Sequence, residues 1–227
     1  MINLTYYGHS CFELQTGPTR MIIDPFLTGN PMASKKAKDV KADFVLVTHA
    51  HGDHLGDAVE IAKANGATVI SNYEIASYCQ GKGTKAHPMH IGGSAPFSFG
   101  RVKLTIAHHG SSFPDWSYGG NPCGFIVTAQ GKRIYHSGDT GLFYDMKLIG
   151  EEGIDVALLP IGDNFTMGTD DALRAVKLIK PHVAIPMHYD TMDVIKQDPH
   201  DFRGRVENET ESKCVILRPG ESYQVAD

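Results

Sequence analysis

The segment Thr48 to His54 places three imidazoles and a carboxylate within six consecutive positions. In an extended stretch, residues two apart project to the same side, so His49 and His51 can reach one ion. Asp53 and His54 follow a glycine, where the chain can turn and bring a second pair of ligands beside the first. The spacing therefore predicts a metal site, and one short loop could serve two ions.

Composition describes a globular chain without a marked charge bias. Its 227 residues are 41% hydrophobic, which is enough for one large domain spanning residues 1–227. The formal net charge of -5, with no basic block beyond residues 35–38, makes nucleic acid an unfavoured partner.

The four cysteines form no Cys-x-x-Cys pair, and we read neither a signal peptide nor a membrane span. A cytoplasmic location is therefore expected, with thiols in the reduced state. Self-association into a homo-oligomer stays open.

The elements that must position the cluster are mostly short apolar strands, with helices between them. Helices are predicted at residues 55–65, 74–80, 145–149, 170–180 and 199–206, with Thr169 and Asp198 as caps of the last two. Strands are predicted at 2–7, 11–15, 20–23, 44–47, 69–70, 97–99, 102–107, 125–128, 133–136, 156–159, 183–186, 214–217 and 223–225. The second half repeats the pattern of the first, which favours two packed sheets with helices outside.

Further candidate ligands stand at or near the ends of the later strands. They are the pair His108-His109, Asp139 and His188. Strand alternation sends neighbouring residues to opposite faces, so we expect only one of His108 and His109 to be a ligand.

The order of these residues resembles the metallo-β-lactamase superfamily. The segments Gly8 to Phe12, Ile23 to Phe26 and Leu159 to Met167 carry a narrower similarity to small metal-dependent hydrolases related to ascorbate-6-phosphate lactonase. This resemblance implies an α/β fold, a four-layer αββα sandwich of two mixed sheets with helices on the outer faces. The site would lie at one edge of the two sheets.

The resemblance also implies a role for each candidate ligand. His49, His51 and His109 would hold one ion, Asp53, His54 and His188 the other, and Asp139 would bridge them. His109 is favoured over His108, the fallback, because Gly110-Ser111-Ser112 follows it in the manner of the family.

Three further residues are candidates for orienting ligands or contacting the substrate. By the same resemblance, Asp24 would accept a hydrogen bond from a ligand imidazole. The resemblance places the turn containing His9 near the pocket, and Asp163 follows an apolar strand either as a turn residue or as a pocket residue. His136 is interpreted as a hydrogen-bonded core or surface histidine.

Five imidazoles and two carboxylates suit two divalent ions, with Zn²⁺ favoured and Mn²⁺, Ni²⁺ or Fe²⁺ able to use the same donors. Two such ions would share a water as hydroxide, with Asp53 and Asp139 positioning it. We therefore expect a hydrolase of a small, anionic or polar ester, lactone, amide or phosphoester. The alternatives are a phosphodiesterase or nuclease, a redox di-iron protein, and a non-catalytic metal sensor.

Overall fold

A computed structural model describes residues 1–225 of the protein. Seven strands form a first sheet: β1 (Ile2–Gly8), β2 (Cys11–Thr16), β3 (Thr19–Ile23), β4 (Phe44–Leu46), β5 (Thr68–Asn72), β6 (Lys85–Met89) and β14 (Ser222–Val225). Seven more form a second: β7 (Ser94–Phe97), β8 (Gly100–Ile106), β9 (Cys123–Ala129), β10 (Lys132–His136), β11 (Val156–Pro160), β12 (Val183–Met187) and β13 (Lys213–Cys214).

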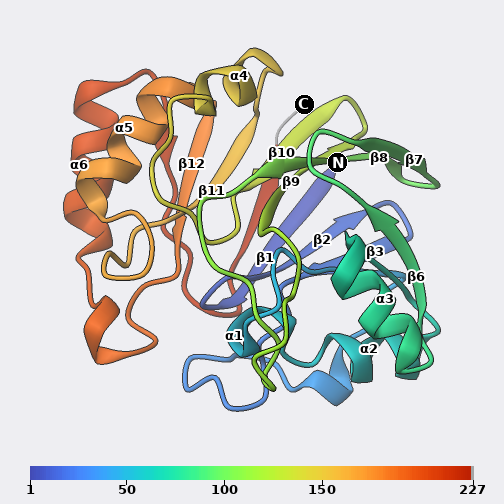
Figure 1. Cartoon of the computed structure of the whole chain (residues 1–227). Helices are drawn as coiled ribbons and strands as arrows, with labels where there is room; N and C mark the ends of the chain where they lie inside the picture. The colour runs from blue at the N-terminus through green and yellow to red at the C-terminus, as the bar shows by residue number, and fades with distance from the viewer. Residues whose placement is uncertain (226–227) are drawn as a thin grey trace.

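The helices lie on the outer faces of the two sheets (Figure 1). Those beside the first sheet are α1 (Gly52–Leu55), α2 (Ala58–Asn65) and α3 (Tyr73–Gly81). Those beside the second are α4 (Met146–Glu151), α5 (Thr169–Ile179) and α6 (Pro199–Glu209). Two short 3₁₀ turns, η1 (Ala37–Asp39) and η2 (Asp193–Ile195), complete the regular structure of residues 1–225. The predicted four-layer arrangement is confirmed.

Both sheets are mixed. The first runs in the order β14-β1-β2-β3-β4-β5-β6, antiparallel up to β3 and parallel from β3 onward. The second runs β13-β12-β11-β10-β9-β8-β7, parallel up to β10 and antiparallel beyond it. As a result, the C-terminal ends of β1, β3 and β4 lie on the same side of the first sheet, and those of β8, β10 and β12 lie on the same side of the second.

Strand alternation distributes the apolar residues over three buried layers. In β4, Val45 packs against the helices while Leu46 faces the second sheet. In β11, Leu158 faces the first sheet and Leu159 packs against α4–α6. Because both faces of these strands are covered, they read in the sequence as continuous apolar runs.

The helix predicted over residues 55–65 is confirmed as α2 from Ala58 to Asn65, but it does not begin at residue 55, because Leu55 ends the separate short helix α1. Gly56 separates them at a φ of 40°, and a Cβ at this position would lie 2.4 Å from the carbonyl oxygen of Pro25. The Asp57 carboxylate then accepts the backbone N–H groups of Leu27 and Thr28. The break lets α1 turn separately, so that it carries Asp53 and His54 into the site.

Other elements also differ from prediction, among them the strand predicted at 214–217, which the structure places at Lys213–Cys214. Strand β6 was not predicted, because it is an edge strand that contains a lysine, a histidine and a proline. The hairpin of β7 and β8 pairs Phe97 with Gly100, so Phe99 lies in its turn. Helix α5 begins at Thr169, with Gly168 as its cap, whereas Asp198 caps α6 through the N–H of His200 as predicted.

Residues 1–225 contain no helix that is both long enough and apolar enough to cross a membrane.

Candidate metal centre

The chemistry-bearing residues follow the ends of strands that finish at the same edge of the sandwich. His9 follows β1, Asp24 follows β3, the segment 48–54 follows β4, and His188 follows β12. Backbone hydrogen bonds join the two sheets here, from His188 N to His9 O at 2.8 Å and from Cys123 N to Thr48 O at 3.0 Å. Loops from both sheets can therefore supply ligands to one centre.

A first group consists of His49, His51 and His109. One ring nitrogen of each lies within 4.8 Å of the others. The Nε2 of His49 is 3.1 Å from the Nδ1 of His51, in the extended stretch before α1. The two alternate residues thus approach each other from one side of the chain, as the spacing predicted.

A second group consists of Asp53, His54, His188 and His9, again with ligand atoms within 4.8 Å of one another. Asp53 and His54 are neighbours on α1, which starts directly after His51. His188 has a left-handed backbone, with a φ of 56°.

Asp139 lies between the two groups. Its Oδ2 is 2.9 Å from His188 Nε2, 3.2 Å from His54 Nε2 and 3.6 Å from His109 Nε2. The turn before it needs a glycine, because Gly138 has a φ of 62° and a Cβ there would lie 2.6 Å from Cys123 O. One carboxylate therefore faces imidazoles of both groups.

Asp24 is fully buried and supports two of the histidines. Its Oδ2 is 2.7 Å from His54 Nδ1 and accepts the Thr48 hydroxyl at 2.7 Å, and its Oδ1 accepts Thr48 N–H at 2.8 Å. The Thr48 hydroxyl is in turn 3.0 Å from His49 Nδ1. With Nδ1 protonated in both rings, each Nε2 keeps its lone pair for the centre.

The electrostatics follow from burial and from these carboxylates. Burial lowers the pKa of His49 well below its usual range. Burial also acts to lower the pKa of His54, but Asp139 and Asp24 outweigh it and raise that pKa well above its usual range. Burial acts to raise the pKa of Asp139, and His188 and His54 overcome it, so this pKa lies well below normal.

The donor atoms fit a bound cation. His54 Nε2, Asp139 Oδ1 and both ring nitrogens of His188 are buried without a hydrogen-bond partner. Buried polar groups normally have partners, and leaving one unsatisfied costs about 1–3 kcal/mol. The close approach of His188 Nε2 to Asp139 without an aligned hydrogen bond is the arrangement that two ligands of one ion would have.

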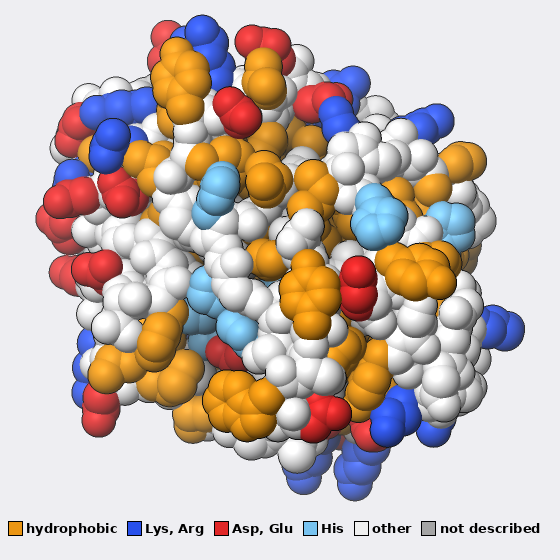
Figure 2. Space-filling model, in the orientation of Figure 1, with side chains coloured by type: hydrophobic (Ala, Val, Ile, Leu, Met, Phe, Trp, Pro, Cys, Tyr) orange, Lys and Arg blue, Asp and Glu red, His pale blue; other side chains and the backbone are white. Residues whose placement is uncertain are grey.

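The centre opens to solvent on one side. The side chains of Asp53 and His109 are 29% and 14% exposed, whereas His49 and His54 are fully buried. Figure 2 shows histidine side chains beside an acidic one in a hollow, with hydrophobic side chains around it. A small molecule could therefore reach the Asp53 and His109 side of the centre.

The sequence of residues 3–188 matches the family described as Beta-lactamase superfamily domain. A metal-dependent hydrolase of the UPF0173 group from Pelotomaculum thermopropionicum is 55% identical over 229 residues, covering 99% of this chain and 100% of the relative. The chain belongs to the metallo-β-lactamase superfamily.

Other superfamily members agree. A UPF0173 metal-dependent hydrolase from Thermus thermophilus is 52% identical, covering 97% of this chain and 98% of its own. The solved structure of Igni18, a metallo hydrolase from Ignicoccus hospitalis, has a TM-score of 0.90 and 41% identity, covering 98% of this chain and 97% of that one. This chain is therefore a metal-dependent hydrolase of this superfamily.

The structure brings together all seven ligands that were predicted from the sequence: His49, His51, Asp53, His54, His109, Asp139 and His188. It does not bring in His108, which is exposed with its ring 5.0 Å from the ring of Phe143. Asp163 is also exposed and stands outside these groups, in a turn where its side chain lies close to Gly168.

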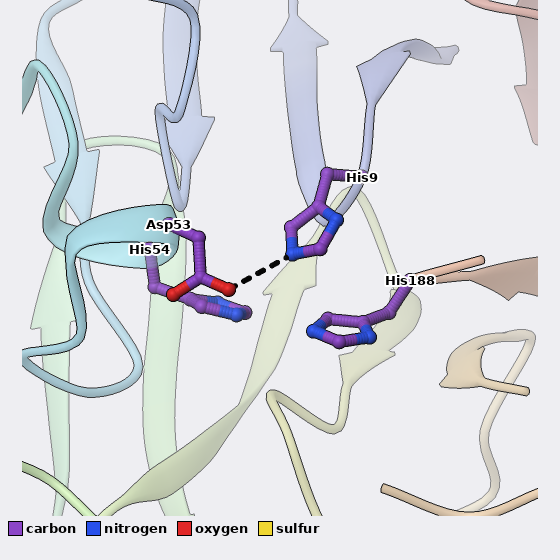
Figure 3. A group of neighbouring side chains, drawn as sticks. All are labelled: His9, Asp53, His54 and His188. Carbon is purple, nitrogen blue, oxygen red and sulfur yellow. Dashed lines mark hydrogen bonds and ion pairs between the residues drawn. The ribbon is translucent and has the colours of Figure 1, made fainter. Parts of the chain in front are cut away.

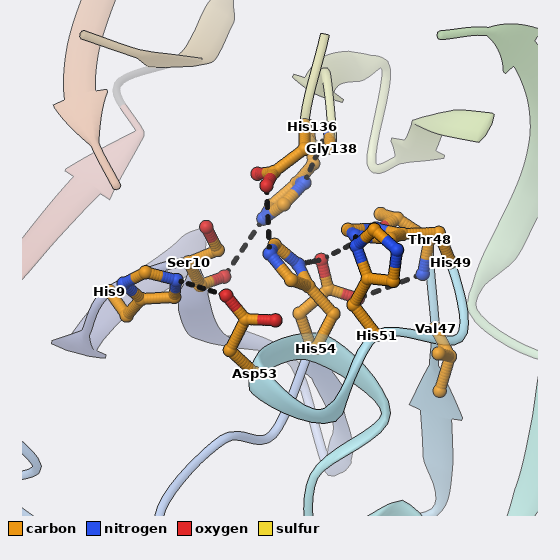
Figure 4. Close-up of polar contacts among 12 residues, drawn as sticks. His9, Ser10, Val47, Thr48, His49, His51, Asp53, His54, His136 and Gly138 are labelled. Carbon is orange, nitrogen blue, oxygen red and sulfur yellow. Dashed lines mark hydrogen bonds and ion pairs between the residues drawn. The ribbon is translucent and has the colours of Figure 1, made fainter. Parts of the chain in front are cut away.

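His136 joins the two sheets rather than facing the centre. Its Nδ1 accepts Gly138 N–H at 3.1 Å, so its Nε2 donates to Ser10 O at 2.9 Å (Figure 4). This ties the turn that carries Asp139 to the turn that carries His9. The prediction of a hydrogen-bonded core histidine is the one that fits this geometry.

Sequence reasoning missed the hydroxyl groups that support the ligands. Thr48 links Asp24 to His49, and Thr191 contacts the ring of His9. Ser111 accepts Ala50 N–H at 3.2 Å and so fastens the loop after His109 to the first histidine segment. The only signal was position, because each lies within three residues of a proposed ligand.

The neighbouring histidines of the pair offer a matched test. We expect His109→Ala to lower zinc affinity, because it removes a donor from the first group, and His108→Ala to bind zinc as the wild type does. Competition for zinc against a chromophoric chelator measures both variants. Loss of zinc from His108→Ala alone would reverse the assignment.

Proposed function

We propose that this superfamily member hydrolyses a small molecule at a dinuclear centre. His49, His51 and His109 would hold one ion, Asp53, His54 and His188 the other, and Asp139 would bridge them. Zn²⁺ suits this donor set best, although Mn²⁺, Ni²⁺ and Fe²⁺ accept the same ligands.

The position of Asp139 carries this proposal. A carboxylate that lies 2.9–3.6 Å from imidazoles of two separate groups is suited to bridge two ions. Its other oxygen is buried with no hydrogen-bond partner. A single ion at either group would leave part of this constellation without a partner.

The chemistry divides between the ions and the side chains. When bound, two divalent ions supply hydroxide at neutral pH and polarise the bond that is attacked. Asp53 and Asp139 would orient the attacking water by accepting its hydrogen bonds. The partly exposed Asp53 is the better placed of the two to pass a proton to the leaving group. Asp24, through His54 and Thr48, would hold the ligand geometry during turnover.

Charge favours an anionic or strongly polar substrate. Two divalent cations against two carboxylates and one hydroxide leave a positive centre. The chain as a whole has a net charge of -5, which disfavours long polyanions such as nucleic acid. We therefore propose a small ester, lactone, amide or phosphoester as the substrate.

The function is tested by metal analysis of protein purified without added chelator, followed by hydrolysis assays. We expect two ions per chain and turnover of at least one probe among lactones, thioesters, amides and phosphoesters. One ion per chain at saturating zinc would refute the dinuclear centre. Full loading without turnover of any probe class would refute the proposed substrate range.

Metal removal should destabilise the fold. Ions that bind only the native state stabilise it by about 4 kcal/mol when the free metal exceeds its Kd about 1,000-fold. For a domain of this size, that corresponds to a fall in Tm of roughly 8–16 °C on chelation. Calorimetry with and without chelator, followed by zinc addition, measures the change. An unchanged Tm in protein shown to lose its metal would contradict the expectation.

A further inference from the structure

His9 is a buried histidine outside the proposed ligand set, and its ring contacts that set. Its Nε2 is 3.2 Å from Asp53 Oδ2, and its Nδ1 is 2.9 Å from Thr191 Oγ1. Figure 3 shows it beside Asp53, His54 and His188, with the dashed contact running to Asp53. Its ring centroid is 4.0 Å from that of His188.

We propose that His9 is a positioning residue for the second ion, which it serves by fixing Asp53 and His188 rather than by binding the ion itself. This inference rests on the proposed function, since it presumes a separate second ion. The Gly8-His9-Ser10 turn would therefore hold two ligands in place without binding an ion.

Hydrogen bonding distinguishes a positioning role from a ligand role. An ionised carboxylate only accepts hydrogen bonds, so a proton must lie on His9 Nε2 for its contact with Asp53. The Nδ1 is then an acceptor, and the Thr191 hydroxyl donates to it. Both ring nitrogens of His9 thus have partners, whereas Nε2 of His188 and Nε2 of His54, the atoms that face Asp139, have none. The unpartnered atoms are those left for the ion.

The backbone of His9 restrains a second member of the same group. Its carbonyl oxygen accepts His188 N–H at 2.8 Å and the Tyr6 hydroxyl at 3.1 Å. His9 holds this arrangement at a φ of 58°, a left-handed conformation that costs a non-glycine residue energy. His9 therefore fixes two ligands of the second group. Neither hydrogen bond of its ring goes to a residue of the first group.

Two substitutions separate the ring contacts. In His9→Gln the amide NH₂ can take the place of Nε2–H and still donate to Asp53. In His9→Asn the shorter amide can reach only toward Thr191, while asparagine tolerates the left-handed backbone well. Because loss of an outer partner typically costs 10- to 100-fold in metal affinity, we expect His9→Asn to bind the second zinc about 10- to 100-fold more weakly. The first zinc should bind normally, and His9→Gln should stay close to wild type at both sites.

The experiment is zinc titration of the full chain against a chromophoric chelator, with ¹⁵N NMR of the histidine rings in the zinc-loaded protein. A proton on His9 Nε2 in the loaded state supports positioning, and a zinc-bound Nε2 overturns it. Equal loss in both variants, or two wild-type affinities in His9→Asn, also overturns it. If the wild type binds only one zinc, the dinuclear function fails first, which keeps the two failures distinguishable.

Discussion

Replacing Asp139 by Asn is expected to abolish hydrolysis while leaving the fold largely intact. The amide has nearly the same shape as the carboxylate, so packing around this buried position is preserved. What it loses is the negative charge that faces His188, His54 and His109 at 2.9–3.6 Å. An amide is a poor bridge between two cations, and its NH₂ would point a donor at atoms that need an acceptor.

The expected loss of activity exceeds the roughly 10- to 100-fold that removal of an outer partner costs, because Asp139 stands at the centre itself. Steady-state hydrolysis and zinc content should be measured on the same preparation, with circular dichroism as the test of folding. Asp171→Asn is a matched control, since Asp171 lies on α5 and pairs with Arg174 on the surface. Retained activity with two ions bound would remove Asp139 from its bridging position.

The sequence predicted most of the site because its ligands lie in short segments at strand ends. His49 and His51 obey the alternation of an extended chain, so their convergence could be predicted locally. The meeting of His54, which follows a strand of the first sheet, with Asp139, which follows a strand of the second, depends on how the two sheets pack, and only the resemblance to a known family supplied it before the structure did.

What the sequence could not show are contacts that depend on backbone conformation. The break at Gly56 arises because Pro25 approaches from another loop, whereas the apolar spacing of residues 55–65 alone fits one helix. The role of His136 likewise depends on Ser10, which is 126 positions away in the chain. Periodicity reports only which face of an element is apolar, so such distant partners leave no local signal.

The second large effect is expected at Asp24, which no solvent reaches and which contacts the proposed ligand His54 directly and the residue Thr48 that supports His49. In Asp24→Asn, an NH₂ group in place of Oδ2 would face the His54 Nδ1–H and the Thr48 hydroxyl, both of which are donors. Breaking a buried charged pair of this kind costs about 3–5 kcal/mol in the free energy of unfolding. We expect that loss in the metal-free protein, measured by denaturant unfolding.

The same substitution should weaken the binding of both ions, because Asp24 orients His54 directly and His49 through Thr48. Each zinc affinity is expected to fall about 10- to 100-fold. Thr48→Val is the matched variant. It removes the link to His49 and leaves the 2.7 Å contact between Asp24 and His54 in place, so only the affinity for the first ion should fall. Zinc titration of both variants decides the matter, and wild-type affinity for both ions in Asp24→Asn would show that this carboxylate does not support the centre.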